Sequence, residues 1–210
     1  MERAAALAKQ LTAETKMGDL RKIAKEIKKD HQLALALWLT GSFKARLLAI
    51  LIMDKNELTE DKINELTQQI ASHPQSEQNQ LMDWLFANQL AKSRRHIRLL
   101  ETWQTSELAL QRRIYWYYQG RLRWMGNNLP ENTEEILTAI ETTIMEEVPE
   151  VQWAMNFTAG WIGVYDDRYQ SRCIDLGERT SLYKDEKVSK GCTPSYLPAF
   201  IQIERAKRQK

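Results

Sequence analysis

Apolar side chains recur three and four residues apart along nearly the whole chain, and this spacing constrains the fold more than any other feature. Leu20, Ile23 and Ile27 show it near the start, and Ile136 and Ile140 show it far downstream. Such spacing places apolar residues on one face of an α-helix. The 210 residues include only 8 glycines, 5 prolines and four valines, whereas sheets need turn residues and β-branched residues. An all-α fold is therefore predicted, and all-β and Rossmann-type folds are excluded.

Short breaks divide this pattern at regular intervals. They predict helices near residues 2–13, 18–29, 31–39, 43–53, 59–71, 75–90, 93–103, 106–125, 132–147, 150–163 and 166–177. The helices group into pairs that start near 18, 58, 93, 131 and 166, a spacing of about 35–40 residues that is typical of stacked helical-pair repeats. We expect a single domain over residues 1–210 with the architecture of a curved α-solenoid; a closed helical bundle is the alternative.

A stretch without helical periodicity lies near the C-terminus, over residues 178–198, and contains a turn cluster at residues 191–194. Loops of this length are uncommon unless they are functional or disordered. Leu182, Tyr183 and Tyr196 supply side chains that can pack. We therefore expect a long ordered loop over residues 178–198.

The formal net charge of +2 conceals a strong segregation of charge. Residues 92–124 hold eight basic residues against two glutamates, a net +6, whereas residues 131–150 hold seven glutamates and no Lys or Arg. Such segregation is typical of a basic face directed at a polyanion. The alternative is two solvated helix faces that pair with each other, and the sequence leaves both interpretations open.

One face of the predicted helix 106–125 combines basic and aromatic residues. The stripe expected to be buried is Ile114, Tyr118, Leu122 and Met125. The stripe expected to be exposed is Arg112, Trp116, Gln119 and Arg123. Arginine interleaved with an aromatic residue suits phosphate contacts and stacking on a sugar or base. The residues expected to contact a nucleic acid are Arg112, Arg123, Arg94, Arg95 and Trp116; alternatively, Arg112 pairs with Glu107 or with the acidic helix that follows.

Signals for a metal, a cofactor or a membrane are missing from the sequence. Cys173 and Cys192 have no His or Cys neighbour at ligand spacing, so we expect reduced thiols and no metal site. The longest apolar run, residues 47–53, is too short to span a bilayer, and the charged first residues do not resemble a signal peptide. We expect no metal, no cofactor, no membrane contact and a cytoplasmic location.

Several segments match a known family in their residues: GDLRKIAKEI at 18–27, LQR at 110–112 and AMNF at 154–157, with LYKD at 182–185 and KGCT at 190–193. With them the chain resembles the AlkD-type DNA alkylation repair enzymes, which are HEAT-like repeat DNA glycosylases. The resemblance covers most of residues 18–198 and is most specific in the first repeat. It implies HEAT-like repeats that form a concave basic face for double-stranded DNA.

The resemblance also implies a chemistry. Active members of this family are monofunctional glycosylases that release cationic N3- and N7-alkylpurines. Two Trp rings pack on the deoxyribose, an Asp one turn from the first Trp stabilises the oxocarbenium-like sugar, and an Arg holds the phosphate. A cationic purine already leaves readily, so negative charge near the sugar matters more than a general acid.

Carried onto this sequence, the phosphate-holding Arg is kept as Arg112, and the other positions are replaced. The first Trp falls on Gln75 and the catalytic Asp on Asn79. The second Trp falls on Phe157, and an Arg one turn later is replaced by Gly160. Because asparagine carries no charge, it cannot stabilise a developing cation as aspartate does. Losing one such group costs about 10²–10³ in rate.

These substitutions predict a divergent family member that binds double-stranded DNA weakly and has little or no alkylpurine glycosylase activity. We also expect a monomer. One alternative is an active glycosylase in which Asp83, one turn beyond Asn79, supplies a relocated carboxylate. A further alternative is a repeat scaffold that binds other proteins, because HEAT-type surfaces serve that role equally well.

Overall fold

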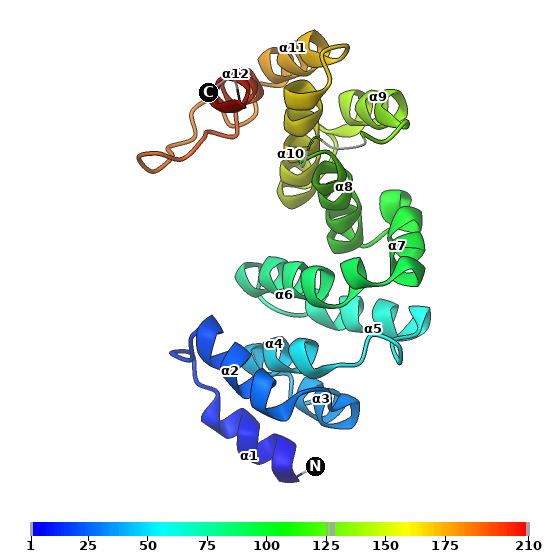
Figure 1. The fold of residues 1–210 in the computed structure, drawn as a ribbon, viewed down its shortest axis with the longest axis vertical. Helices are drawn as coiled ribbons and strands as arrows, with labels where there is room; N and C mark the ends of the chain where they lie inside the picture. Colours follow the sequence, from blue (N-terminus) through cyan, green and yellow to red (C-terminus); the bar gives the residue numbers. More distant parts are fainter. Residues whose placement is uncertain (1, 125, 127–128, 209–210) are drawn as a thin grey trace. The chain divides into compact units, whose positions relative to one another are not determined.

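The computed structural model describes residues 2–124, 126 and 129–208, and all regular structure in this part of the chain is helical (Figure 1). The α-helices are α1 (Glu2–Gln10), α2 (Met17–Ile27), α3 (His31–Trp38), α4 (Phe43–Ile52), α5 (Glu60–Ala71), α6 (Gln75–Asn88), α7 (Arg94–Glu101), α8 (Ala109–Trp124), α9 (Thr133–Thr143), α10 (Pro149–Tyr165), α11 (Gln170–Thr180) and α12 (Leu197–Arg208). Short 3₁₀ turns lie at Leu90–Lys92 and Thr102–Thr105. The all-α prediction is confirmed, with helix ends shifted by a few residues.

The chain divides into two compact units, Met1–Trp103 and Gln104–Lys210, and each is described by itself. The expectation of a single domain over residues 1–210 stays a prediction.

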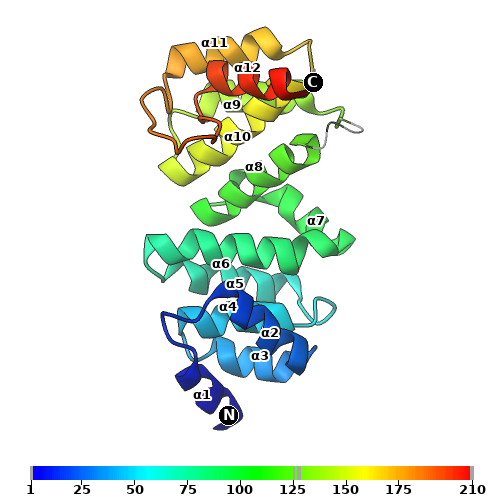
Figure 2. The same ribbon diagram turned by 60° about the vertical axis from the view of Figure 1, so that its left-hand side comes forward.

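The helices of the first unit stack in successive layers (Figures 1 and 2). Helix α4 packs against α2, α3 and α6, while α3 also contacts α1 and α5 contacts α6. The pair predicted to start near residue 58 is confirmed as α5 and α6. The pair predicted to start near residue 18 is wrong, because α2 packs on α4, and α3 and α4 form the pair instead. Because most residues of α4 are apolar, the helix can be buried among these neighbours.

Side-chain caps define where helices of the first unit begin. The Asp30 carboxylate accepts a hydrogen bond from the Leu33 N–H at 3.0 Å at the start of α3. The Thr59 hydroxyl accepts one from the Lys62 N–H at 3.2 Å at the start of α5. Each cap satisfies a backbone donor that has no partner within its helix. These local signals explain why both helix starts lie within one residue of their predicted positions.

In the second unit, α10 is the central helix (Figure 2). It packs along α8 and also contacts α9, α11 and α12, while α11 and α12 pack on each other. Glycines permit these close approaches. A Cβ on Gly120 of α8 would lie 2.5 Å from the Phe157 ring, and one on Gly163 of α10 would lie 2.5 Å from Ile201 of α12.

The segment without helix near the C-terminus is shorter than predicted, and the expectation that it is an ordered loop stays a prediction. Helix α11 continues to Thr180 and α12 begins at Leu197, so the loop covers residues 181–196. As expected from their side chains, Leu182, Tyr183 and Tyr196 are half-buried. Burial raises the pKa of Tyr183 to about 12. Helix α12 itself was not predicted, and it closes one side of α10 and α11.

Among the described residues, no helix combines the length and apolarity needed to cross a membrane. The same residues contain no group of three or more His, Cys, Asp or Glu side chains placed to hold a metal ion. Cys173 is buried and Cys192 is exposed, and neither forms a disulfide.

Candidate nucleic-acid interface

Helix α8 buries the face that was predicted to be exposed. Trp116, Gln119 and Arg123 are 2%, 4% and 1% exposed. Because α8 lies along α10, this stripe packs inside the unit, and the Thr158 hydroxyl of α10 donates to the Trp116 carbonyl at 2.6 Å. The predicted exposed stripe is therefore wrong for three of its four residues. Their buried positions leave Trp116 and Arg123 no surface for a phosphate or a base.

The burial of the opposite stripe of α8 was also predicted only in part. Ile114 is fully buried as expected, whereas Tyr118 and Leu122 are half-buried. Met125 lies outside the described residues. Both faces of α8 carry aromatic residues, so apolar periodicity alone could not distinguish the inward face.

Arg123 joins the end of α8 to the start of α9. Its Nη1 donates to the carbonyl and the side-chain oxygen of Gln119, at 2.9 and 3.1 Å. Its Nη2 donates to Asn132 at 2.9 Å and to Thr133 at 3.3 Å. Burial lowers the pKa of Arg123 to about 10. The residue therefore acts as an internal link between two helices.

Arg112 is held by a two-point ion pair with Glu147. Its Nε and Nη2 lie 2.7 and 2.8 Å from the two carboxylate oxygens. Its Nη1 donates to the backbone carbonyls of Ser106 at 2.6 Å and Glu107 at 3.1 Å. Hydrogen bonding to Glu147 raises the pKa of Arg112. This geometry matches the alternative in which Arg112 pairs with the acidic segment; a phosphate could bind Arg112 only by displacing Glu147.

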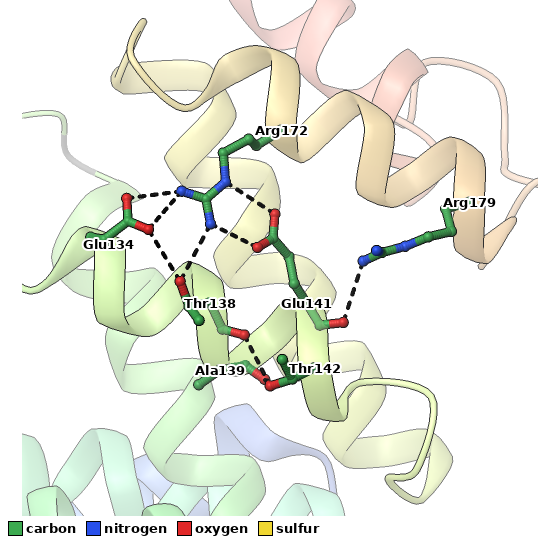
Figure 3. A network of polar contacts seen from close by, with 7 residues as sticks. All are labelled: Glu134, Thr138, Ala139, Glu141, Thr142, Arg172 and Arg179. Atoms are coloured by element: carbon green, nitrogen blue, oxygen red, sulfur yellow. Dashed lines mark hydrogen bonds and ion pairs between the residues drawn. The ribbon is translucent and has the colours of Figure 1, made fainter.

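Two glutamates of α9, Glu134 and Glu141, pair with an arginine of α11 (Figure 3). Arg172 lies 2.8 Å from Glu134 and 2.7 Å from Glu141. Arg179 donates to the Glu141 carbonyl at 3.3 Å. Hydrogen bonding to Arg172 lowers the pKa of Glu134. Glutamates of residues 131–150 therefore bond to arginines of α11 as well as to Arg112, which lies in the basic segment 92–124.

The positions matched to the first Trp and the catalytic Asp lie on α6 in the first unit. Gln75 is exposed, and Asn79 and Asp83 are half-buried; their spacing of four residues puts all three on one helix face. The Asn79 Oδ1 is buried and has no hydrogen-bond partner among the described residues. The ring nearest along the helix is Trp84, whose Nε1 donates to the Leu47 carbonyl at 3.1 Å.

Arg94 and Arg95 lie at the start of α7 in the first unit, and both are exposed, as contact with a nucleic acid would require. The Arg95 guanidinium also donates to the Leu58 carbonyl at 2.5 Å. Their role in DNA binding stays a prediction. Of the arginines predicted to contact DNA, Arg94 and Arg95 on α7 are therefore exposed, whereas Arg112 and Arg123 on α8 bond to other residues of the chain.

Helix α10 carries a continuous stripe of aromatic side chains that the sequence interpretation missed. Its members are Trp153, Phe157, Trp161 and Tyr165, at successive intervals of four residues. Neighbouring ring centroids lie 5.6, 6.1 and 5.9 Å apart. Tyr117 and Trp124 of α8 and Phe200 of α12 contact the same stripe. The spacing of four residues between these aromatic residues was the feature of the sequence that could have revealed the stripe.

Arginines lie over the rings of this aromatic stripe and its neighbours. Arg113 lies 5.4 Å from the Trp153 centroid, and Arg121 lies 4.6 Å from that of Trp124. Arg208 lies 5.2 Å from Trp161 and 4.5 Å from Tyr165. Arg121 and Arg208 are exposed, and the Arg208 Nη1 also donates to the backbone carbonyl and the carboxylate of Glu204, at 2.6 and 3.3 Å. Stacked guanidinium groups keep their N–H donors at the ring edge, where they can reach a phosphate.

Phe157, matched to the second Trp, belongs to this stripe and is half-buried. Its ring lies 5.3 Å from Tyr117 and stacks on Trp153. A Cβ on Gly160 would lie 2.9 Å from the Phe200 ring. Helix α12 therefore fills the space that the family's Arg would need at Gly160.

The sequence and the fold are similar to those of known proteins. The family model described as DNA alkylation repair enzyme matches residues 9–161. An uncharacterised protein of Listeria monocytogenes, Lmo0209, is 25% identical over 198 residues, which cover 92% of this chain and 83% of the relative.

A solved structure has the same fold, with a TM-score of 0.65 and 19% identity, covering 100% of this chain and 88% of the other. It is described as a new family of proteins related to the HEAT-like repeat DNA glycosylases, with affinity for branched DNA structures. The expected HEAT-like solenoid class is therefore confirmed. Because the family model spans well over half of the sequence, the chain belongs to the DNA alkylation repair enzyme family.

Proposed function

We propose that this protein binds DNA and has little or no ability to excise alkylpurines. The observation that carries the proposal is the pair of residues at the catalytic positions of the family, Gln75 and Asn79. Neither carries a charge, and neither offers a flat apolar ring for the deoxyribose. Phe157 and Gly160 depart from the family in the second unit, where α12 occupies the space beside them.

Exposed arginines support the DNA-binding part of the proposal. Arg121 and Arg208 lie over aromatic rings, and Arg94 and Arg95 are exposed on α7. The affinity of the solved relative for branched DNA favours the same ligand class. With a net charge of only +2, we expect weak, strongly salt-dependent binding to plain duplex. A monomer in the cytoplasm with reduced thiols belongs to the same proposal.

Two measurements test the proposal. The first incubates the protein with a duplex treated with a methylating agent and follows the release of methylpurines, with an active glycosylase of the family as the positive control. We expect release at the background rate. Release at a rate comparable to the control would overturn the claim of lost activity, and Asp83→Asn in the same assay would then show whether Asp83 is the relocated carboxylate.

The second measurement is duplex affinity as a function of salt concentration. We expect log K to fall with log salt. Arg121→Ala combined with Arg208→Ala should reduce that slope by about one for each phosphate that the protein no longer binds. Arg179→Ala is the matched control, because this arginine is equally exposed and is not among the residues proposed to contact DNA. Absence of binding at low salt would favour the protein-binding scaffold.

A further inference from the structure

A small cleft in the second unit lies between the aromatic stripe of α10 and the C-terminal loop. It is lined by Trp153, Asn156, Phe157, Thr193, Ser195 and Phe200. Its cavity volume is about 80 Å³, well below the range of about 300–1,000 Å³ for sites that enclose a small molecule, so the cleft can cover only part of a ligand. Three of the six lining residues are aromatic, so the cleft offers flat apolar surface to a planar ligand.

Asn156 adds an unsatisfied hydrogen-bond acceptor to this lining. The residue is only 4% exposed. Its Nδ2 donates to the Ser195 carbonyl at 2.8 Å, which fixes the orientation of the amide, because a flipped amide would set two acceptors against each other. Its Oδ1 is buried and has no partner among the described residues. A buried acceptor without a partner destabilises the protein, and a ligand N–H would satisfy it.

The rim of the cleft is tethered rather than loose. The Thr193 hydroxyl donates to the Glu204 carboxylate of α12 at 2.7 Å. The Ser195 N–H donates to Glu186 at 3.0 Å within the loop. With the Asn156 bond, these contacts hold residues 193–195 against α10 and α12. The loop therefore forms one wall of the cleft.

Charge near the cleft favours a ligand that is attached to phosphate. Arg113, which lies over Trp153, is buried. Arg208, which is exposed, lies over Trp161, one turn along the stripe from Phe157. Aromatic faces stack on any base, and arginines beside them suit the backbone that carries the base. A base that is unpaired exposes both its faces and its ring N–H or amino groups, which a base within a duplex does not.

We propose that this cleft binds a single unpaired nucleobase of DNA, stacked against Trp153 and Phe157, with the Asn156 Oδ1 accepting a hydrogen bond from its amino or ring N–H group. The inference rests on the proposed DNA binding and specifies its ligand as DNA with an unpaired base. Bulged DNA and DNA with single-stranded branches contain such bases, and fully paired duplex does not.

The test uses the full-length protein and fluorescent oligonucleotides of one sequence in three forms: a fully paired duplex, the same duplex with one unpaired 2-aminopurine, and the single strand. We expect the unpaired form to bind about tenfold more tightly than the paired form, because stacking of a base on an aromatic residue has about this value. We also expect 2-aminopurine fluorescence to be quenched on binding, as stacking requires.

Variants test whether the cleft causes the preference for the unpaired form. Trp153→Ala should abolish the preference for the unpaired form, and Trp153→Phe, which keeps a flat ring, should retain most of it. Trp124→Ala is the control, since this exposed ring contacts the stripe at Trp161 and does not line the cleft. It should leave the ratio of the two affinities unchanged. The quenching measurement on the unaltered protein remains decisive if Trp153→Ala fails to fold.

The outcomes separate the two proposals. Equal affinity for paired and unpaired forms, without quenching, overturns the cleft assignment and leaves the proposed duplex binding intact. Binding and quenching with the single strand but no binding to duplex supports the cleft and overturns the duplex proposal. No binding to any form overturns both.

Discussion

Arg112 and Glu147 hold each other by two hydrogen bonds of 2.7 and 2.8 Å, so the arginine that the family uses for a phosphate is occupied by a carboxylate of the same chain. Both side chains are mostly buried, with 19% and 14% exposed. A phosphate must compete with a preformed partner in this position. The pair thus links the segregated charges seen in the sequence to the weak DNA binding that we propose.

Removing the carboxylate tests this relationship. We expect Glu147→Gln to lower the free energy of unfolding by about 2 kcal/mol, because it removes a charge-assisted hydrogen-bonded pair. We also expect it to increase the slope of log K against log salt for duplex binding by about one, because the released Arg112 can bind one more phosphate. Glu146→Gln changes the charge equally at an exposed neighbour and should change neither. An unchanged salt slope in Glu147→Gln would show that Arg112 has only a structural role.

Arg123 should affect stability, unlike its exposed neighbour Arg121. Arg123→Met leaves the acceptors on Gln119, Asn132 and Thr133 without their donor, and we expect a decrease of about 2–3 kcal/mol in the free energy of unfolding. Arg121→Met should leave the unfolding transition unchanged and weaken duplex binding. Denaturant titration and salt-dependent binding of the two variants measure both effects, and the reverse pattern would contradict the structural assignment.

These arginines show which parts of the structure could be predicted from the sequence. Helix periodicity and caps such as Asp30 and Thr59 act locally, so the helices were largely predictable. The inward face of α8 was not, because both of its faces carry aromatic residues and packing against α10 decides between them. The aromatic cleft depends on Asn156 and Ser195, which lie 39 residues apart. Only tertiary structure brings such residues together, and the catalytic positions matched through the resemblance stay predictions.

Restoring the aspartate of the family should not restore its activity. In Asn79→Asp, a carboxylate oxygen would occupy a buried position that lacks a hydrogen-bond partner among the described residues. We expect a decrease of about 1–3 kcal/mol in the free energy of unfolding, and methylpurine release at background because Gln75 still offers no ring for the sugar. Gln80→Glu, an equal charge change at an exposed position of α6, should be neutral. Recovery of excision by Asn79→Asp alone would show that the site otherwise remains competent.

The two cysteines should differ sharply in reactivity. Burial raises the pKa of Cys173 to about 12, whereas Cys192 is exposed. A thiol reagent at mildly alkaline pH should therefore label one thiol per folded chain and two after unfolding, and Cys192→Ser should remove the fast reaction.

Because folding raises the pKa of Cys173, the folded state keeps its proton when the unfolded state, with a pKa near 9, has released it. The contribution of this thiol to stability therefore falls as pH rises from about 9 toward 12. Cys173→Ala should remove this contribution to the alkaline slope, and an unchanged slope would contradict the assignment.

Gly177 should be intolerant of a side chain, because α11 and α12 meet there. A Cβ at this position would lie 2.5 Å from Cδ of Pro198 and 2.7 Å from Cβ of Leu197. Neither atom can move without shifting α12, so we expect Gly177→Ala to lower the free energy of unfolding by about 1–3 kcal/mol. Gly18 of α2 has no atom within 4 Å of the corresponding position, and Gly18→Ala should be neutral or stabilising by about 0.5 kcal/mol. Thermal unfolding of both variants measures the difference, and equal stabilities would contradict the close contact between α11 and α12. Because α12 also carries Phe200 and tethers Thr193, Gly177→Ala should weaken quenching of unpaired 2-aminopurine as well.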